Sequence, residues 1–400
     1  MTIVLLSTTI LQSLAAQGGT LEMPVRCLEP DWTTGTSKAV IVEDISLVHT
    51  AQILPFDEQQ EIVTGGLSNQ TERVLALLRG LLSSGRSDLA TAVKLNVYIS
   101  TSNDMPVVLQ ALAREFFHAN KPAATFVVTP LPQPAARVAM DVVAPMRVQS
   151  KTANVEWISP LGYHDREISP AASAPTGTIV YISGMADTNS LADATRITLD
   201  KLMSALGHLG LTRSDVIQLK AFFQPMSQAA VVRKAIVDFY GGIAPPTVFV
   251  EWISPAPNPP IEIELIAAGK SDSTKDSQSV VFLTPPGTSS TKVFSRVAKV
   301  NRGKIIFISG LYGMNARDGE GEVREIFQSL DKILKSTGSD FEHLVKATYY
   351  VSDDVAGNKL NDIRPEFFNP LRPPAASKAK VRGVGVPHKT VTLDMIAVTK

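Results

Sequence analysis

The chain has 400 residues, of which 44% are hydrophobic and 19% are charged, a composition typical of a globular protein. Its length exceeds the size at which a single hydrophobic core keeps growing, so we expect two to four domains. Its 38 basic and 38 acidic residues balance. A protein that neutralises many phosphates has a basic excess or a basic stripe, so the composition disfavours a dedicated nucleic-acid-binding function.

Residues 1–17 are apolar and loosely resemble a secretory signal, but they lack a basic first segment. We therefore expect a cytoplasmic protein, with export through an atypical N-terminal signal as the alternative. No apolar run is long enough to span a bilayer, so no membrane partner is expected. The single cysteine, Cys27, excludes an intrachain disulfide, and the histidines lack metal-ligand spacing. No metal and no cofactor are expected.

The predicted elements repeat three times along the chain. Each copy has an apolar strand that ends in a turn, an amphipathic helix, a second strand, and a final strand after a proline-rich stretch. In copy one these lie at 45–52, 69–84, 92–99 and 136–143. In copy two they lie at 178–184, 190–209, 217–223 and 261–267. In copy three they lie at 304–310, 322–336, 344–351 and 390–398. We predict modules at 1–150, 151–270 and 271–400, with polar linkers at 150–154 and 269–279.

Four landmarks recur in the same order in every copy. Lys94, Lys220 and Lys346 are equally spaced, and each follows a Ser-Asp pair near the start of the second strand. An aromatic pair precedes a proline in each copy. Lysines that enter a strand usually extend their ammonium groups into water, which is the position we predict for these three.

These landmarks, the Ile182-Ser183-Gly184 and Ile308-Ser309-Gly310 turns, and the last strand at 261–267 resemble the Rid (YjgF-like) family, also labelled L-PSP endoribonuclease. The resemblance covers most of the chain. It implies an α+β, chorismate-mutase-like fold, normally a homotrimer with clefts between its subunits. Three copies in one chain then predict mixed sheets in a pseudo-threefold barrel with the helices outside. We expect a pseudo-trimeric monomer, with pairing of copies between chains or further self-association as the alternatives.

The resemblance also implies a site in each cleft for a small imine or enamine acid. In the family an arginine two residues after the proline holds the substrate carboxylate, and an acidic residue positions the attacking water. Here Ala124, Ala376 and either Thr247 or Val248 occupy the arginine position, so the arginine is missing from every copy. The acidic position in the last strand is filled each time, and the predicted catalytic residues are Asp141, Glu264 and Asp394. An acid in a strand can also simply face solvent.

The predicted ligand-binding residues are the small and hydroxyl-bearing residues at the strand ends and after the missing arginine: Ser183, Gly184, Ser309, Gly310, Thr50, Thr125 and Ser377. Each could equally serve only its local turn or strand. Arg296 and Arg382 could replace the missing carboxylate clamp, although nothing in the sequence places them in a cleft.

Two classes of function remain open from the sequence. The retained acids favour hydrolytic deamination of an imine or enamine, with a carboxylate that activates water. The lost arginine favours a non-catalytic small-ligand-binding or regulatory protein, or a substrate without a carboxylate, because a buried bidentate contact is worth about 2–5 kcal/mol. A ribonuclease is supported by the family label alone, and the neutral charge argues against it.

Overall fold

The computed structural model describes residues 25–147, 154–160, 163, 165–253, 259–270 and 278–400. The N-terminal segment 1–17 and most of both predicted linkers lie outside these residues. We refer to 25–147 as module one, to the described residues of 154–270 as module two, and to 278–400 as module three.

The three modules contain the same elements in the same order. Module one has β1 (Val25–Asp31), β2 (Thr36–Val42), β3 (Leu47–Thr50), α1 (Gly66–Ser84), β4 (Lys94–Ile99), α2 (Met105–Glu115), β5 (Ala123–Val128) and β6 (Val138–Pro145). Module two has β7 (Glu156–Ile158), β8 (Ala171–Ala174), β9 (Ile179–Asp187), α3 (Leu191–Gly207), β10 (Val216–Phe223), α4 (Ala229–Tyr240), β11 (Thr247–Glu251) and β12 (Ile261–Ala268). Module three has β13 (Val280–Leu283), β14 (Val297–Val300), β15 (Ile305–Ile308), α5 (Gly319–Ser336), β16 (Leu344–Val351), α6 (Asp354–Ile363), β17 (Ala375–Lys380) and β18 (Val391–Val398).

Each module is an α+β unit with one strand order, β5-β4-β6-β3 in module one and its counterparts in the other two. The second helix of each module (α2, α4, α6) and the parallel strand that follows it were not expected. The sequence of this stretch predicts only a proline-rich connection, and α2 itself is short and carries a proline in its first turn. The two helices pack side by side on one face of their sheet, over a separate apolar core in each module.

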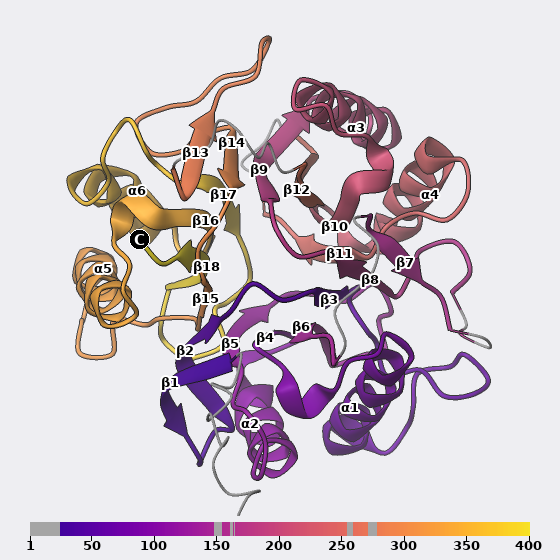
Figure 1. Ribbon diagram of the computed structural model, residues 1–400. Helices are drawn as coiled ribbons and strands as arrows, with labels where there is room; N and C mark the ends of the chain where they lie inside the picture. Colours follow the sequence, from indigo (N-terminus) through magenta and orange to yellow (C-terminus); the bar gives the residue numbers. More distant parts are fainter. Residues whose placement is uncertain (1–24, 148–153, 161–162, 164, 254–258, 271–277) are drawn as a thin grey trace, which may run out of the picture.

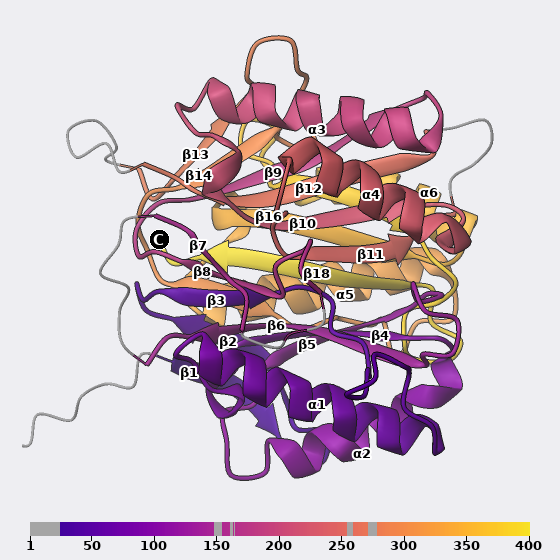
Figure 2. The same ribbon diagram turned by 90° about the vertical axis from the view of Figure 1, so that its right-hand side faces the viewer.

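The modules exchange strand contacts in a cycle. Strand β8 of module two pairs with β3 of module one, β14 of module three pairs with β9 of module two, and β2 of module one pairs with β15 of module three. In Figure 1 the modules occupy three sectors with their sheets inward and their helices outward, and Figure 2 shows the helices on the outer surface. Backbone pairing among the described residues gives one twelve-stranded and one six-stranded sheet, and it does not close a barrel.

Strand register defines which residues are equivalent in the three copies. Lys94 and Lys346 pair with the residue two positions after the acid of the last strand. In module two that residue, Ile266, pairs with Gln218, whereas Lys220 pairs with Glu264 itself. The equal spacing of the three lysines therefore does not reflect structural equivalence, because module two carries its lysine two residues later on β10.

A fourth apolar cluster fills the space between the modules and draws residues from all three of them. Next to it, His49 on β3 is 2% exposed, and none of the described residues forms a hydrogen bond with either of its ring nitrogens. Its register equivalents in the other modules are the aromatic residues Tyr181 and Phe307. None of the helices within the described ranges is long and apolar enough to cross a membrane.

Candidate functional site

Each contact between modules forms a junction with a common backbone frame. The residue that follows the paired stretch of one module donates a backbone hydrogen bond to the residue that precedes the first paired residue of the next module. Ala51 N donates to Pro170 O over 2.8 Å, Ser183 N donates to Arg296 O over 3.0 Å, and Ser309 N donates to Lys38 O over 2.9 Å. We call these junction 1–2, junction 2–3 and junction 3–1. Pro170, Arg296 and Lys38 thus occupy one equivalent position.

Junction 2–3 brings together three of the predicted ligand-binding residues. Ser183 Oγ donates to Ser295 O over 2.5 Å and accepts from Ala376 N over 2.7 Å. Gly184 N donates to Ser377 Oγ over 3.1 Å. The hydrogen bonds of Ser183 therefore link module two to module three, and Gly184 and Ser377 lie at the same interface.

Two further charged residues converge on Gly184. Arg296 Nη1 donates to Gly184 O over 2.7 Å. A Cβ atom on Gly184 would lie only 1.9 Å from Glu262 Oε1, so the carboxyl group of Glu262 rests directly on the glycine. A side chain at position 184 would force the carboxyl group of Glu262 out of this place. Glu262 and Arg296 are both partly exposed, so solvent reaches this pair.

The carboxyl group of Glu262 has an unusual acidity. Burial raises its pKa to about 7, against a hydrogen bond from Ser377 and the positive charge of Arg296, which lower it. Burial also lowers the pKa of Arg296. At neutral pH a substantial share of Glu262 is protonated and the rest is ionised, so this group can both accept and donate a proton.

Register places Ala139 and Thr392 at the position of Glu262 in the other two modules. At junction 3–1, Ser309 Oγ accepts from Ala124 N over 2.7 Å and donates to Ser37 O, and Gly310 N donates to Ala124 O over 2.8 Å. Thr125 Oγ1 donates to Leu393 O over 3.2 Å. A cavity of about 670 Å³ opens here, with Met105, Phe126 and Leu311 among its lining residues. The junction has neither an acid at the Glu262 position nor an arginine at the Arg296 position.

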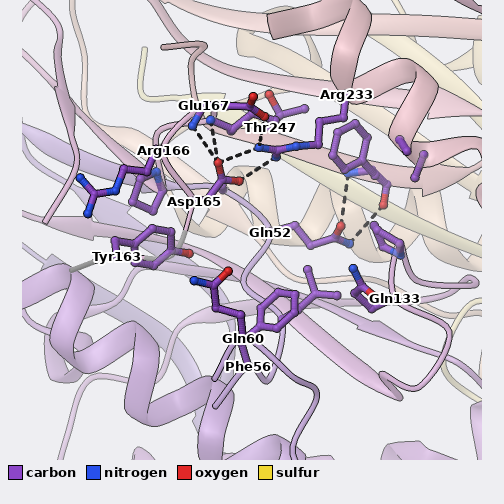
Figure 3. A pocket seen from close by; sticks show the side chains of 18 residues that line it. Gln52, Phe56, Gln60, Gln133, Tyr163, Asp165, Arg166, Glu167, Arg233 and Thr247 are labelled. Carbon is purple, nitrogen blue, oxygen red and sulfur yellow. Dashed lines mark hydrogen bonds and ion pairs between the residues drawn. The ribbon is translucent and has the colours of Figure 1, made fainter. Parts of the chain in front are cut away.

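Junction 1–2 has a cavity of about 570 Å³, which is drawn in Figure 3. Gln52 occupies the position of Gly184. Its Nε2 donates to Phe249 O over 3.1 Å, and its Oε1 accepts from Phe249 N over 3.4 Å. Arg233 forms a bidentate ion pair with Asp165, in which Nη1 and Nη2 each donate to a carboxylate oxygen over 2.7 Å. The cavity is polar, but Ala139 leaves it without the carboxyl group that junction 2–3 has.

Thr50, the remaining predicted ligand-binding residue, is fully buried at the end of β3. Its Oγ1 accepts from Val142 N over 2.9 Å, and its carbonyl oxygen accepts from Gln218 Nε2 over 2.7 Å. Both polar groups are thus used inside the protein. Thr50 does not line the cavity of junction 1–2.

The three predicted catalytic acids lie in none of the junctions and do not face bulk solvent. They belong to an internal ionic cluster, which we define as Asp141, Glu264, Asp394, Lys94, Lys220 and Lys346. The lysines are 3%, 4% and 6% exposed, so the prediction that they reach water is wrong. Every acid of the cluster is also buried.

Ion pairs and hydrogen bonds across modules hold this cluster together. Asp394 of module three lies 3.1 Å from the ammonium groups of both Lys94 and Lys220. Glu264 of module two lies 2.9 Å from that of Lys346. Asp141 accepts from Asn96 over 3.1 Å and from Tyr98 over 2.7 Å. Lys94 also donates to Thr125 over 2.9 Å and to Ile308 O over 2.8 Å.

The cluster shifts the ionisation of its members in opposite directions. Burial raises the pKa of Asp141. Burial would also raise the pKa of Asp394, but the charges of Lys94, Lys220 and Lys346 hold it well below its usual value. Asp394 is therefore a permanent anion at neutral pH, with its partners in direct contact. Such a group is a poor proton acceptor.

The site residue that sequence reasoning missed is Glu262. Strand alternation puts Glu262 and Glu264 on the same face of β12, and both glutamates were visible in the sequence. Repetition favoured Glu264, because the other copies have an acid only at that position. Arg296 was considered and lies at the junction, whereas Arg382 pairs with Glu251 Oε1 over 2.9 Å. Within the described ranges no group of histidine, cysteine, aspartate and glutamate residues could hold a metal ion.

Residues 29–146 and 288–399, more than half of the chain, match the model of the family described as Endoribonuclease L-PSP. The chain belongs to this family. The matched residues are those of modules one and three, and module two shares their strand order and junction frame.

Similar proteins include a RutC family protein from Aquifex aeolicus, 34% identical over 91 residues, which are 21% of this chain and 71% of that protein. A 2-iminobutanoate/2-iminopropanoate deaminase from Capra hircus is also 34% identical over 91 residues, 21% of this chain and 65% of the deaminase. A solved structure of the Rid family protein YyfB from Yersinia pestis aligns with 31% of this chain and 100% of its own, at 22% identity and a TM-score of 0.29.

Proposed function

We propose that this chain is a Rid-like hydrolytic deaminase of small imines or enamines and that its active site is junction 2–3. The observation that carries the proposal is Glu262, a carboxyl group with a pKa of about 7 that is in contact with Gly184, Ser377 and solvent. A general acid–base catalyst works best when its pKa lies near the working pH. The relatives named as 2-iminobutanoate/2-iminopropanoate deaminases support this reaction class.

In the proposed reaction the ionised Glu262 takes a proton from a water molecule while the water oxygen attacks the carbon of the C=N bond. Glu262, now protonated, gives this proton to the nitrogen, and a neutral tetrahedral amino alcohol forms. The ionised Glu262 then takes the hydroxyl proton and transfers it to the nitrogen as the C–N bond breaks, so that ammonia leaves and the carbonyl product remains. One imine and one water thus give one carbonyl compound and one ammonia. An enamine enters the same sequence after it tautomerises to the imine.

The arrangement of the modules supports a single closed unit. We infer that the three modules form a pseudo-threefold ring within one chain, because the pairings β8–β3, β14–β9 and β2–β15 form a complete cycle. Each junction is then built within the chain, so no second copy is required for the site. The proposed partner is a small metabolite.

The test is ammonia release from 2-iminopropionate and 2-aminoacrylate generated in situ, for the natural protein and for Glu262→Gln. We expect catalysis by the natural protein and a loss of about 10²–10⁴-fold in the variant. Ser214→Ala, on the exposed surface before β10, is the control and should retain full activity. No release above the uncatalysed background, or full activity in Glu262→Gln, would overturn the proposal.

A second function, binding without chemistry, is favoured at junction 1–2 by the cavity that Gln52 and Arg233 line (Figure 3). The carboxylates Asp165 and Glu167 that line it are both held in ion pairs with Arg233, and Ala139 adds no carboxyl group at the Glu262 position. Calorimetric titration with the carbonyl products of the reaction tests this function. Binding that survives Glu262→Gln but disappears on Gln133→Trp, at the exposed rim of the cavity, would support a separate binding site.

A further inference from the structure

The substrate class depends on whether junction 2–3 has a group that binds a carboxylate. The sequence argues against a carboxylate, because the arginine of the related family is absent after every proline. The structure supplies a guanidinium from another element, on the segment between β13 and β14 of the neighbouring module. Arg296 precedes β14 and points back across the junction to Gly184 O, 2.7 Å away.

The described neighbours of Arg296 leave its charge without an anion in direct contact. Within the described residues its side-chain hydrogen bonds go to two carbonyl oxygens, Gly184 O over 2.7 Å and Ser289 O over 3.2 Å. One face of the guanidinium lies over the ring of Phe294, 5.2 Å from its centroid. Glu262 is the nearby acid that interacts with its charge, and none of the ion pairs recorded within the described ranges joins the two. A partly buried guanidinium held by carbonyl groups favours a bound anion.

A comparison of the three junctions strengthens this argument. The Arg296 position is Pro170 in junction 1–2 and Lys38 in junction 3–1, and Lys38 is paired with Glu29 at 2.9 Å on the surface. Junction 2–3 thus combines an arginine at this position with a glutamate on the last strand. The two charged residues come from different modules and meet on the same glycine, which is the arrangement that a ligand with both a carboxylate and a hydrolysable C=N group requires.

We infer that Arg296 is the carboxylate-binding residue of junction 2–3 and that the ligand is a small 2-imino acid or its 2-oxo acid product. This inference rests on the proposed function for the reaction but not for the binding step. Arg296 fixes the carboxylate by charge-assisted hydrogen bonds. The adjacent C=N carbon then lies toward Glu262, which activates the water. The guanidinium is thus supplied by module three to an acid of module two, in place of the arginine missing at Ala376.

The experiment compares ligands that differ only in charge. Calorimetry measures the affinity of the full chain for pyruvate and for its neutral isostere pyruvamide, and kinetics compare 2-iminopropionate with 2-iminopropionamide. We expect pyruvate to bind more tightly than pyruvamide. Arg296→Ala should lose at least about thirtyfold in pyruvate affinity with little change for pyruvamide. KM for 2-iminopropionate should rise more than kcat falls, because the contact is made in both the ground state and the transition state.

The matched control is Arg382→Ala, which removes an arginine of module three that pairs with Glu251 of module two. Its affinity for pyruvate should stay unchanged. Arg296→Lys keeps the charge and a hydrogen-bond donor, so it should recover part of the affinity that Arg296→Ala loses. It also reports on binding if the alanine variant folds poorly.

The outcomes separate this inference from the proposed function. Deamination with equal affinity for pyruvate and pyruvamide, or with no effect of Arg296→Ala on pyruvate, would overturn the role of Arg296 and leave the proposed reaction intact. If pyruvate binding depends on Arg296 but the protein has no deaminase activity, the carboxylate-binding role of Arg296 is supported and the proposed deamination is overturned. Equal losses for both ligands would mean that Arg296 only holds the junction together, which also contradicts the inference.

Discussion

Glu262 and Glu264 lie two residues apart on one face of β12, yet their surroundings differ completely. Glu264 is deep in the internal ionic cluster, where Lys346 and Thr348 are in direct contact with its oxygens. Glu262 is at the solvent-accessible end of the same strand face, where burial is partial and none of the described residues places a cation in contact with it. Glu264 therefore belongs to the buried structure of the cluster and not to a surface that a ligand can reach. An unpaired carboxyl group costs stability and gains reactivity.

The largest effect on stability should come from the cluster. Asp394→Asn leaves the buried Lys94 and Lys220 without their shared anion, which should lower the free energy of unfolding by about 3–5 kcal/mol. Urea unfolding at pH 7 measures it. The control is Asp331→Asn, which removes an exposed helical ion pair with Lys335 and should cost about 0.5 kcal/mol or less. A small effect of Asp394→Asn would mean that the cluster is more hydrated than the structure shows.

The second prediction concerns Glu262 and has the opposite sign. Its pKa is raised from 4.5 to about 7 in the folded protein, so the folded state binds this proton more tightly than the unfolded state does. The natural protein therefore loses stability as the pH rises from 4.5 through 7, by up to about 3 kcal/mol. Glu262→Gln should remove this loss and be more stable than the natural protein at pH 8. Identical unfolding curves of the two proteins at pH 5 and pH 8 would argue against the raised pKa.

The third prediction tests the contact between Gly184 and Glu262. In Gly184→Ala the new methyl group would overlap Glu262 Oε1, so the carboxyl group must move away. We expect a loss of about 1–3 kcal/mol in stability and a larger loss of deaminase activity. Gly207→Ala is the control, because open space surrounds that position at the end of α3. Full activity in Gly184→Ala would show that Glu262 need not lie on residue 184.

The smallest predicted effect concerns His49, a buried group that has no partner. Burial lowers its pKa from 6.5 to about 4. The contribution of the neutral imidazole to the free energy of unfolding is therefore fully present above pH 6.5 and is lost as the pH falls toward 4. His49→Phe introduces the residue type of the equivalent Phe307. When the pH falls from 7.5 to 5.5, the free energy of unfolding of the variant should decrease by about 1 kcal/mol less than that of the natural protein. Thermal unfolding at both pH values measures the difference, and parallel curves would contradict it.

Much of the fold could be predicted from the sequence because local patterns encode it. The long helix and the three predicted strands of each module are short-range signals, and they lie within a few residues of the ranges that the sequence indicated. The second helix of each module was missed. Its apolar pattern extends over few turns, and its stability depends on packing against the longer helix beside it, which is a tertiary contact.

The candidate site was harder to predict, for a different physical reason. Ser183, Gly184 and Ser377 were identified because they are embedded in a motif. The role of Glu262 depends on how far along β12 the solvent reaches, and that depth is set by the neighbouring module. Arg296 reaches the junction through a backbone hydrogen bond to Ser183, which joins residues far apart in the sequence. A repeat comparison detects only what the copies share, such as the Ser-Gly pair of junctions 2–3 and 3–1, whereas Glu262 and Arg296 are residues that one junction has and the other two lack.

The cyclic pairing of three fused modules has a consequence for inheritance. In an assembly of identical subunits, every mutation appears at all the sites at once, so a change that helps one site and harms another is not retained. In this chain Pro170, Arg296 and Lys38 are encoded by separate codons, and each junction can be altered while the others hold the ring together. We therefore expect one catalytic site per polypeptide, while the other two junctions are free to acquire other roles.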